Sequence, residues 1–299
     1  MRITENMITS KVLSNLQLNV GRLEKIQQQA STGLKVSRPG EDPVSAQQIL
    51  QLKGLLKDAD QYGRNITVGN SWLEQSDSAM NDMGNIVTRA REIAVQMANG
   101  TYSAQDRISA ASEVAQLKKE LIQLGNTQIG GNYIFGGYVS DRPPFDAATG
   151  AYNGTNDSIN MEIDRGSYVA INVAGGPLLR GGTPPGSTGT DLIGTLDALN
   201  TALTVNDTTG VQATLTGLTS AQNQILALRG DVGARLNRVQ TATENNDAVK
   251  VSLNKVVSAK QDADILQVMS DLTTQQTAFQ AALSATAKTS QMSLLDYLR

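Results

Sequence analysis

Residues 44–98 decide the fold, and they read VSAQQILQLKGLLKDADQYGRNITVGNSWLEQSDSAMNDMGNIVTRAREIAVQMA. Apolar side chains recur in this stretch every seventh residue, at Leu52, Ala59, Ile66, Leu73, Met80, Val87 and Ala94. A sustained spacing of seven is typical of the core position of a helix that packs along other helices. The stretch therefore predicts one helix of about 80 Å, at 1.5 Å per residue. Such a helix needs neighbours to hold it.

Two other stretches can supply these neighbours. A shorter apolar stripe runs from Val114 to Leu124, and a second long one runs from Ile225 to Val256. Arg235 and Asn246 fall on the second stripe, where polar side chains more often fix the register than carry out chemistry. The sequence predicts a mainly α protein: a long coiled-coil-like helical bundle built from both chain ends, with a small β-rich insert in the middle.

Both ends of the chain carry thinner apolar stripes. Apolar residues step by three and four in each, at Leu13, Leu16, Val20, Leu23 and Leu34 near the start and at Ile265, Met269, Leu272, Phe279 and Leu283 near the end. Amphipathic helices with so thin a stripe are marginal alone in water. We expect both ends to be mobile in the free monomer and ordered only against partners, so these residues are the candidate assembly interface.

A linker separates the first terminal helix from the long one. Pro39 and Pro43 lack backbone donors and push the preceding residues toward extended geometry. Asp42 is a good N-cap and Pro43 suits the first helical position. Pro39, Asp42 and Pro43 are therefore expected to form an interlayer linker between two helical layers.

The middle of the chain has a different composition. Five of the seven prolines lie between residues 143 and 185, among many glycines. Apolar and polar residues alternate over 159–163 and 169–173, and the residues between them, 164–167 (DRGS), supply a turn. This pattern predicts a β-hairpin.

The sequence thus divides into three parts. Residues 1–38 and 262–299 would form the terminal helices of an inner assembly layer. Residues 39–132 and 208–261 would form the long helical bundle. Residues 133–207 would form a β-rich outer insert.

Composition excludes several classes of function. The chain of 299 residues has no cysteine and no histidine, which removes thiolate nucleophiles, thiolate zinc sites and the usual neutral-pH acid and base. A net charge of −3 gives no reason to expect a nucleic acid or an anionic membrane as partner. Glu162 and Asp164 could be read as a carboxylate pair, but alternation on a solvated strand accounts for them. We expect no enzyme activity, cofactor or metal, although a glycosidase or adhesin in the insert stays an alternative.

The beginning of the chain lacks the apolar run of a cleavable secretory signal, and no stretch is long and apolar enough for a membrane helix. We expect a cytoplasmic protein or one exported by a route that does not use such a signal.

Several segments carry a family resemblance. They are residues 30–36 (ASTGLKV), 41–46 (EDPVSA), 132–137 (NYIFGG) with 144–145 (PF), 152–154 (YNG) and 293–298 (SLLDYL). The first resembles the helix-end segment of the flagellin superfamily. The others resemble the hook-filament junction branch of that superfamily, in which Asp-Pro stands where filament flagellins usually continue Asp-Ala-Ala-Gly. Glu41 departs from the second aspartate frequent in that branch and keeps the acidic character.

The resemblance implies a structural subunit of the bacterial flagellum. It would form an adaptor layer between the hook-side junction protein and the flagellin filament. It would be exported unfolded by the flagellar type III apparatus and be assembled outside the cell. Partners implied are copies of itself, the hook-side junction protein, flagellin and an export chaperone, and the implied assembly interface extends to Leu294 and Leu298. A filament flagellin is the main alternative, and a cytoplasmic coiled-coil scaffold is another.

Overall fold

The computed structural model describes the backbone of residues 2–182, 186 and 188–297. Side chains are described over the same residues except 2–6, 8, 9 and 288–297.

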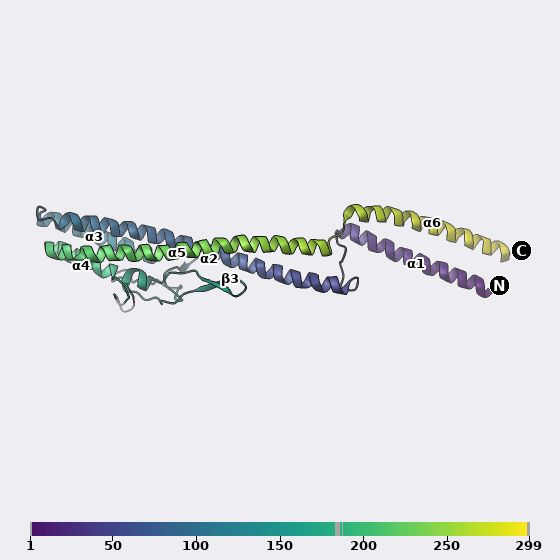
Figure 1. Cartoon of the computed structure of the whole chain (residues 1–299), viewed down its shortest axis with the longest axis horizontal. Helices are drawn as coiled ribbons and strands as arrows, with labels where there is room; N and C mark the ends of the chain where they lie inside the picture. The colour runs from purple at the N-terminus through teal and green to yellow at the C-terminus, as the bar shows by residue number, and fades with distance from the viewer. Residues whose placement is uncertain (1, 183–185, 187, 298–299) are drawn as a thin grey trace. The chain divides into compact units, whose positions relative to one another are not determined.

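The chain forms two compact units (Figure 1). One unit comprises Met1–Asp58 and Val249–Arg299, and the other comprises Ala59–Ala248. This partition does not test the expected division into terminal layer, bundle and insert, which stays a prediction.

Long helices dominate both units, so the mainly α fold is confirmed. The α-helices are α1 (Arg2–Thr32), α2 (Pro43–Met97), α3 (Ala104–Gly125), α4 (Leu192–Thr204), α5 (Thr208–Gln261) and α6 (Ile265–Tyr297). The predicted long helix over 44–98 corresponds to α2 within one residue at each end. The second predicted stripe, 225–256, lies within α5.

The seven-residue repeat of α2 faces the core. Its members from Ala59 to Ala94 are all buried, and Leu73, Met80 and Val87 are completely inaccessible to solvent. Helix α5 contributes Ile225, Val232 and Val239 to the same hydrophobic cluster, at seven-residue intervals. The repeat therefore marks the packed seam of a helical bundle, as predicted.

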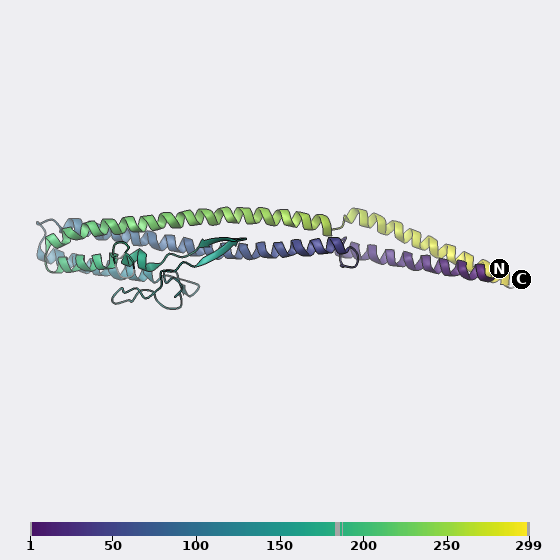
Figure 2. The same ribbon diagram turned by 60° about the horizontal axis from the view of Figure 1, so that its bottom comes forward.

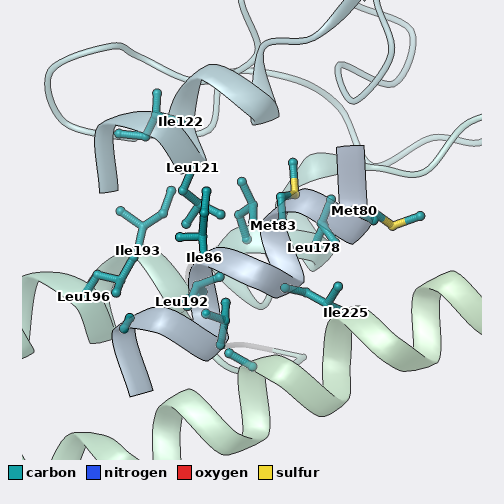
Figure 3. Packing of buried hydrophobic residues seen from close by; sticks show 14 of the residues in the cluster. Met80, Met83, Ile86, Leu121, Ile122, Leu178, Leu192, Ile193, Leu196 and Ile225 are labelled. Atoms are coloured by element: carbon teal, nitrogen blue, oxygen red, sulfur yellow. The ribbon is translucent and has the colours of Figure 1, made fainter. Parts of the chain in front are cut away.

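Helices α3 and α4 complete the bundle in the second unit. Figure 3 shows side chains from α2, α3, α4 and α5 packed in one cluster. The labelled members are Met80, Met83 and Ile86 of α2, Leu121 and Ile122 of α3, Leu192, Ile193 and Leu196 of α4, Ile225 of α5 and Leu178 of the insert. Polar contacts at the rim fix the register, because Arg229 Nε donates to Asp77 Oδ1 at 2.9 Å and Gln222 Nε2 donates to Thr88 Oγ1 at 3.2 Å.

Two short antiparallel ladders interrupt the helices. Strand β1 (Gln128–Ile129) pairs with β2 (Asn132–Tyr133), and β3 (Asn160–Asp164) pairs with β4 (Ser167–Ala170). The second ladder confirms the predicted hairpin, but its last predicted residues lie beyond β4. There the side chain of Asn172 replaces the ladder, since its Oδ1 accepts from the Ile159 amide and its Nδ2 donates to the Asp157 carbonyl.

Strands occupy less of residues 133–207 than the composition suggested. A short π-helix, η1 (Gly176–Arg180), follows the hairpin, and α4 comes after it. Leu192, Leu196, Leu199 and Leu203 give α4 a fully buried helical face. The proline- and glycine-rich stretch before α4 obscured this pattern.

Phe145 and Tyr152 form the centre of the insert. Their rings lie 5.2 Å apart, and the hydroxyl of the half-buried Tyr152 lies within donating distance of the Thr155 and Phe135 carbonyls, at 2.7 and 3.0 Å. Burial raises the pKa of Tyr152 to about 12. A Cβ at Gly125, the last residue of α3, would lie 2.7 Å from the Phe145 ring, so this glycine lets the insert approach the bundle.

A buried arginine closes one end of the bundle. The Arg107 guanidinium donates to the carbonyls of Met97, Asn99 and Tyr102 at 2.8–3.0 Å, and so satisfies acceptors at the C-terminus of α2. Its Nη1 also donates to Asn206 Oδ1 at 2.5 Å. Asn206 has φ of 60° in the turn between α4 and α5. The Arg107 side chain thus bonds to both the turn after α2 and the turn between α4 and α5.

We predict that Leu73→Ala lowers the free energy of unfolding by about 2–5 kcal/mol, because it leaves a cavity at a site with no solvent access. Urea denaturation followed by circular dichroism measures the change. Val68→Ala, on the exposed side of the same helix, is the matched control and should cost less than about 1 kcal/mol. Equal effects of the two changes would contradict the assigned core face.

We predict that Arg107→Ala destabilises the bundle by roughly 2–4 kcal/mol, because the buried Met97 carbonyl and the partly buried Asn99 carbonyl lose their donor. Arg107→Lys should rescue little of the loss, since an ammonium cannot reach four acceptors in a fixed plane. Urea midpoints of both variants test this, and full rescue by lysine would show that the charge alone matters.

Candidate assembly surface

The terminal helices α1 and α6 form an antiparallel pair. Figures 1 and 2 both place the two chain ends together at one end of this pair. At the other end, the Ala263 amide donates to the Gly33 carbonyl at 2.8 Å and the Lys35 amide donates to the Gln261 carbonyl at 2.7 Å. Midway along, Gln275 Nε2 donates to the Asn19 carbonyl at 3.4 Å. These bonds fix the register of the two helices.

The seam between α1 and α6 follows a strict alternation of three and four residues. Its members are the shielded side chains Val12, Leu16, Asn19, Leu23, Ile26 and Ala30 on α1 and Val268, Leu272, Gln275, Phe279, Ala282 and Thr286 on α6. Of these twelve, Val268 alone is buried, and the others are half-buried. The pair has two helices, a thin seam and several polar seam positions, so it has little core of its own.

The predicted interface residues separate into two groups. Leu16, Leu23, Leu272 and Phe279 lie in the seam and are half-buried there. Five others stay 37–57% exposed, and we call them the outer flank: Leu13, Val20, Ile265, Met269 and Leu283.

Four of the five outer-flank residues lie on one side of the helix pair, and Ile265 lies in line with the seam at the start of α6. Leu13 and Val20 each follow a seam residue of α1 by one position, and Met269 and Leu283 each follow a seam residue of α6 by one position. One position is a turn of about 100° in the same sense on both helices, and in an antiparallel pair this brings both sets to the same side. These four apolar side chains therefore share one side of the pair, where the exposed Gln27 and Gln276 occupy the same helical position between them.

The remaining predicted residues lie elsewhere. Leu34 is half-buried where the chain leaves α1, in an isolated bridge with Asp262. The side chain of Leu294 and the whole of Leu298 lie outside the described residues.

Sequence reasoning missed several members of this surface. Val12, Ile26, Val268 and Ala282 belong to the seam, and a seven-residue register starting one position earlier in each helix would have found them. Leu18 and Leu266 are also strongly exposed and were not predicted.

The linker is ordered by its own carboxylates. Glu41 Oε2 accepts from the Ser37 and Arg38 amides at 2.9 and 3.2 Å. Asp42 accepts from the hydroxyl and amide of Ser45 at 2.5 and 3.0 Å, which caps the start of α2 at Pro43 as predicted. Pro39, which precedes both carboxylates in the chain, is exposed. Hydrogen bonding from Ser37 lowers the pKa of Glu41, and hydrogen bonding from Ser45 lowers the pKa of Asp42.

Among the described residues, no three acidic side chains gather closely enough to hold a metal ion. None of the described helices combines the length and apolar character needed to cross a membrane.

Comparison with known proteins defines the class. The model for the bacterial flagellin N-terminal helical region matches residues 3–140, and the model for the C-terminal helical region matches residues 215–298. The chain therefore belongs to the flagellin family, and both matches include the helices that form the assembly surface.

Individual relatives within the flagellin family include both a hook-associated protein and a flagellin. The flagellar hook-associated protein 3 of Salmonella typhimurium is 28% identical over 317 residues, covering 100% of both chains. Flagellin FlaB1 of Treponema pallidum is 25% identical, covering 98% of this chain and 97% of its own. The crystal structure of Bacillus cereus FlgL has the same fold, with a TM-score of 0.60 and 22% identity over 70% of this chain and 99% of that one.

We predict that the linker loosens in acid. Because the pKa of Glu41 is lower in the folded chain, its bonds stabilise the linker above the ordinary value of 4.5 and are lost as pH falls through the lowered value. An NMR titration of the Glu41 carboxyl carbon should show a midpoint below that in a peptide of residues 35–45. Identical midpoints in chain and peptide would contradict these bonds.

Proposed function

We propose that this protein is a structural subunit of the bacterial flagellum, in the adaptor layer that joins the hook-side junction protein to the flagellin filament. The observation that carries the proposal is the outer flank. It leaves an apolar strip exposed on a helix pair whose seam is too thin to support an independent fold. Burial of this strip against neighbouring subunits would stabilise both the pair and the assembly.

The contrast between the two units supports this role. The bundle has a large core with many fully inaccessible side chains, whereas the described part of the terminal pair has one buried side chain, Val268. A stiff bundle suits a part that transmits torque, because close packing resists deformation. A terminal helix pair of low stability suits a part that is stabilised when neighbouring subunits bury its exposed face.

The linker would serve the layer arrangement. Pro39, Asp42 and Pro43 lie in the break between α1 and α2, and the carboxylates of Glu41 and Asp42 accept hydrogen bonds that keep this break ordered. We infer that the terminal pair forms an inner layer and that this linker lets the two layers pack differently.

The junction role is favoured over that of a filament flagellin. The hook-associated protein 3 relative matches along its whole length, and residues 41–46 (EDPVSA) resemble the junction branch. A flagellin also matches along nearly the whole chain, so polymer behaviour is the discriminating measurement. A junction subunit forms a short layer, whereas a filament flagellin grows long filaments by itself.

The proposal extends to place and partners. The protein would work outside the cell, in contact with copies of itself, the hook-side junction protein and flagellin. It would leave the cell through the flagellar export apparatus, held unfolded by an export chaperone. It would act as a structural part without enzyme activity.

We predict that Leu283→Asp blocks incorporation into flagella by at least tenfold, because a charge on the outer flank opposes its burial. The variant is tested in a strain that lacks the natural gene, by immunoblotting of isolated flagella and by swimming. Thr273→Asp, on an exposed position of the same helix, is the matched control and should assemble normally.

Two outcomes would count against the proposal. Normal incorporation of Leu283→Asp would remove the outer flank from the interface. Failure to find the unaltered protein between hook and filament, by gold labelling in electron micrographs, would reject the junction role itself.

A further inference from the structure

The sulfur chemistry of this chain is limited to methionine. The chain has eight methionines and no cysteine, so thioethers are its only sulfur groups. Hydrogen peroxide oxidises a thioether to a sulfoxide, which turns a flexible apolar side chain into a polar one. Exposure to solvent decides which methionines react, because the oxidant must reach the sulfur atom.

The described methionine side chains differ widely in exposure. Three of them lie on α2 in the core of the bundle and are at most 5% exposed: Met80, Met83 and Met97. Met161 is half-buried in β3. Met269 on α6 and Met7 on α1 are 48% and 67% exposed. Among the methionines whose side chains are described, the two exposed thioethers therefore both lie on the terminal helices.

Met269 is the sulfur-bearing member of the outer flank. It follows the buried seam residue Val268 by one position, so it lies beside the seam and outside it. The other four flank residues are leucine, valine and isoleucine, whose saturated side chains do not react with peroxide. Oxidation of Met269 alone can therefore change the polarity of this surface.

Met7 has the same chemistry on a different face. It precedes the seam residue Val12 by five positions, about 140° around α1, and it lies about 120° from Leu13 of the outer flank. The Met7 side chain is therefore directed away from both the seam and the outer flank. The chain thus contains a matched pair of exposed methionines, of which only Met269 belongs to the proposed interface.

We propose that Met269 is a peroxide-sensitive modification site that controls docking of the free subunit. The Met269 Sδ attacks one oxygen of hydrogen peroxide, so that an S–O bond forms and the O–O bond breaks. The departing hydroxide takes the hydroxyl proton from the oxidised sulfur, and the products are methionine sulfoxide and water. Sulfur loses two electrons and the peroxide gains them. The sulfoxide oxygen must give up its bound water when the flank is buried, so docking weakens.

The inference rests on the proposed function, because it takes the outer flank as the surface that neighbouring subunits bury. It adds an order of events to that function. A free subunit presents Met269 to the oxidant, whereas an assembled subunit covers it. Oxidation therefore stops the addition of new subunits and leaves the layer already formed intact, and a methionine sulfoxide reductase restores the free subunit.

Peptide mass spectrometry of the purified full chain tests the site itself. Brief treatment with hydrogen peroxide should oxidise Met269 about tenfold faster than Met80 and Met83, because these two have no solvent access. In isolated flagella, Met269 should react about fivefold more slowly than in the free chain, since neighbouring subunits cover it. Equal rates in the free chain and in flagella would overturn the proposal.

Binding to isolated hooks that carry the hook-side junction protein, taken from a strain that lacks the natural gene, tests the consequence. Peroxide treatment of the unaltered chain should lower its binding about tenfold, and methionine sulfoxide reductase should restore it. Met269→Leu removes the thioether and keeps the surface apolar, so its binding should withstand the same treatment. Met7→Leu is the matched control and should stay as sensitive as the unaltered chain.

A polar substitution tests the same site without an oxidant. Met269→Gln places an uncharged polar side chain on the outer flank and should be incorporated about tenfold less in cells. Met7→Gln makes the same change on the other face of α1 and should be incorporated normally. Equal incorporation of the two variants would contradict a role for Met269 in docking.

The outcomes separate this inference from the proposed function. If the oxidised chain binds hooks as well as the untreated chain, or if Met269→Leu is as sensitive to peroxide as the unaltered chain, Met269 does not control docking. The junction role stands in either case, because the untreated chain still binds. If the untreated chain fails to bind hooks, the proposed function fails first and this inference fails with it.

Discussion

Packing of α2 against α5 is the constraint on which the rest of the structure depends. The two helices are separated in sequence by the insert, yet their apolar repeats meet at Leu73, Met80 and Val232 in one seam. Bonds from Arg229 to Asp77 and from Gln222 to Thr88 hold that seam in register. Because this pair is long and rigid, α3 and α4 can pack beside it, and the turns at its end can be tied by Arg107. The terminal helices, by contrast, have no such support.

Much of this architecture was accessible from the sequence, for a physical reason. An uninterrupted seven-residue repeat has one structural solution, so α2 was predicted to within a residue at each end. The cap at Asp42 and the hairpin at β3 and β4 were predicted from local chemistry, which depends on few neighbours. Helix α4 was missed because its apolar face follows a stretch rich in proline and glycine. Its burial depends on α3, which lies far away in sequence.

The sequence predicted which helices carry the candidate assembly surface. It did not predict which of their apolar residues lie in the α1–α6 seam and which stay exposed on the outer flank. A stripe as wide as Leu13, Leu16, Val20 and Leu23 contains two faces, and the sequence does not say which of them meets the partner helix of the same chain. The register set by Asn19 and Gln275 decides this, and it leaves Leu13 and Val20 outside the seam. Pair formation within the chain and the association proposed between chains would thus use adjacent faces of the same helices.

The pairing of the first helix with the last also affects the order in which the chain can fold during synthesis. Asn19 and Gln275 are 256 residues apart, and at a synthesis rate of about 5–20 residues per second the early partner waits roughly 13–50 s for the late one. During that interval the apolar seam side chains of α1 have no partner helix within the chain. A seam that pairs the first helix with the last therefore forms late, after the helices between them have been synthesised.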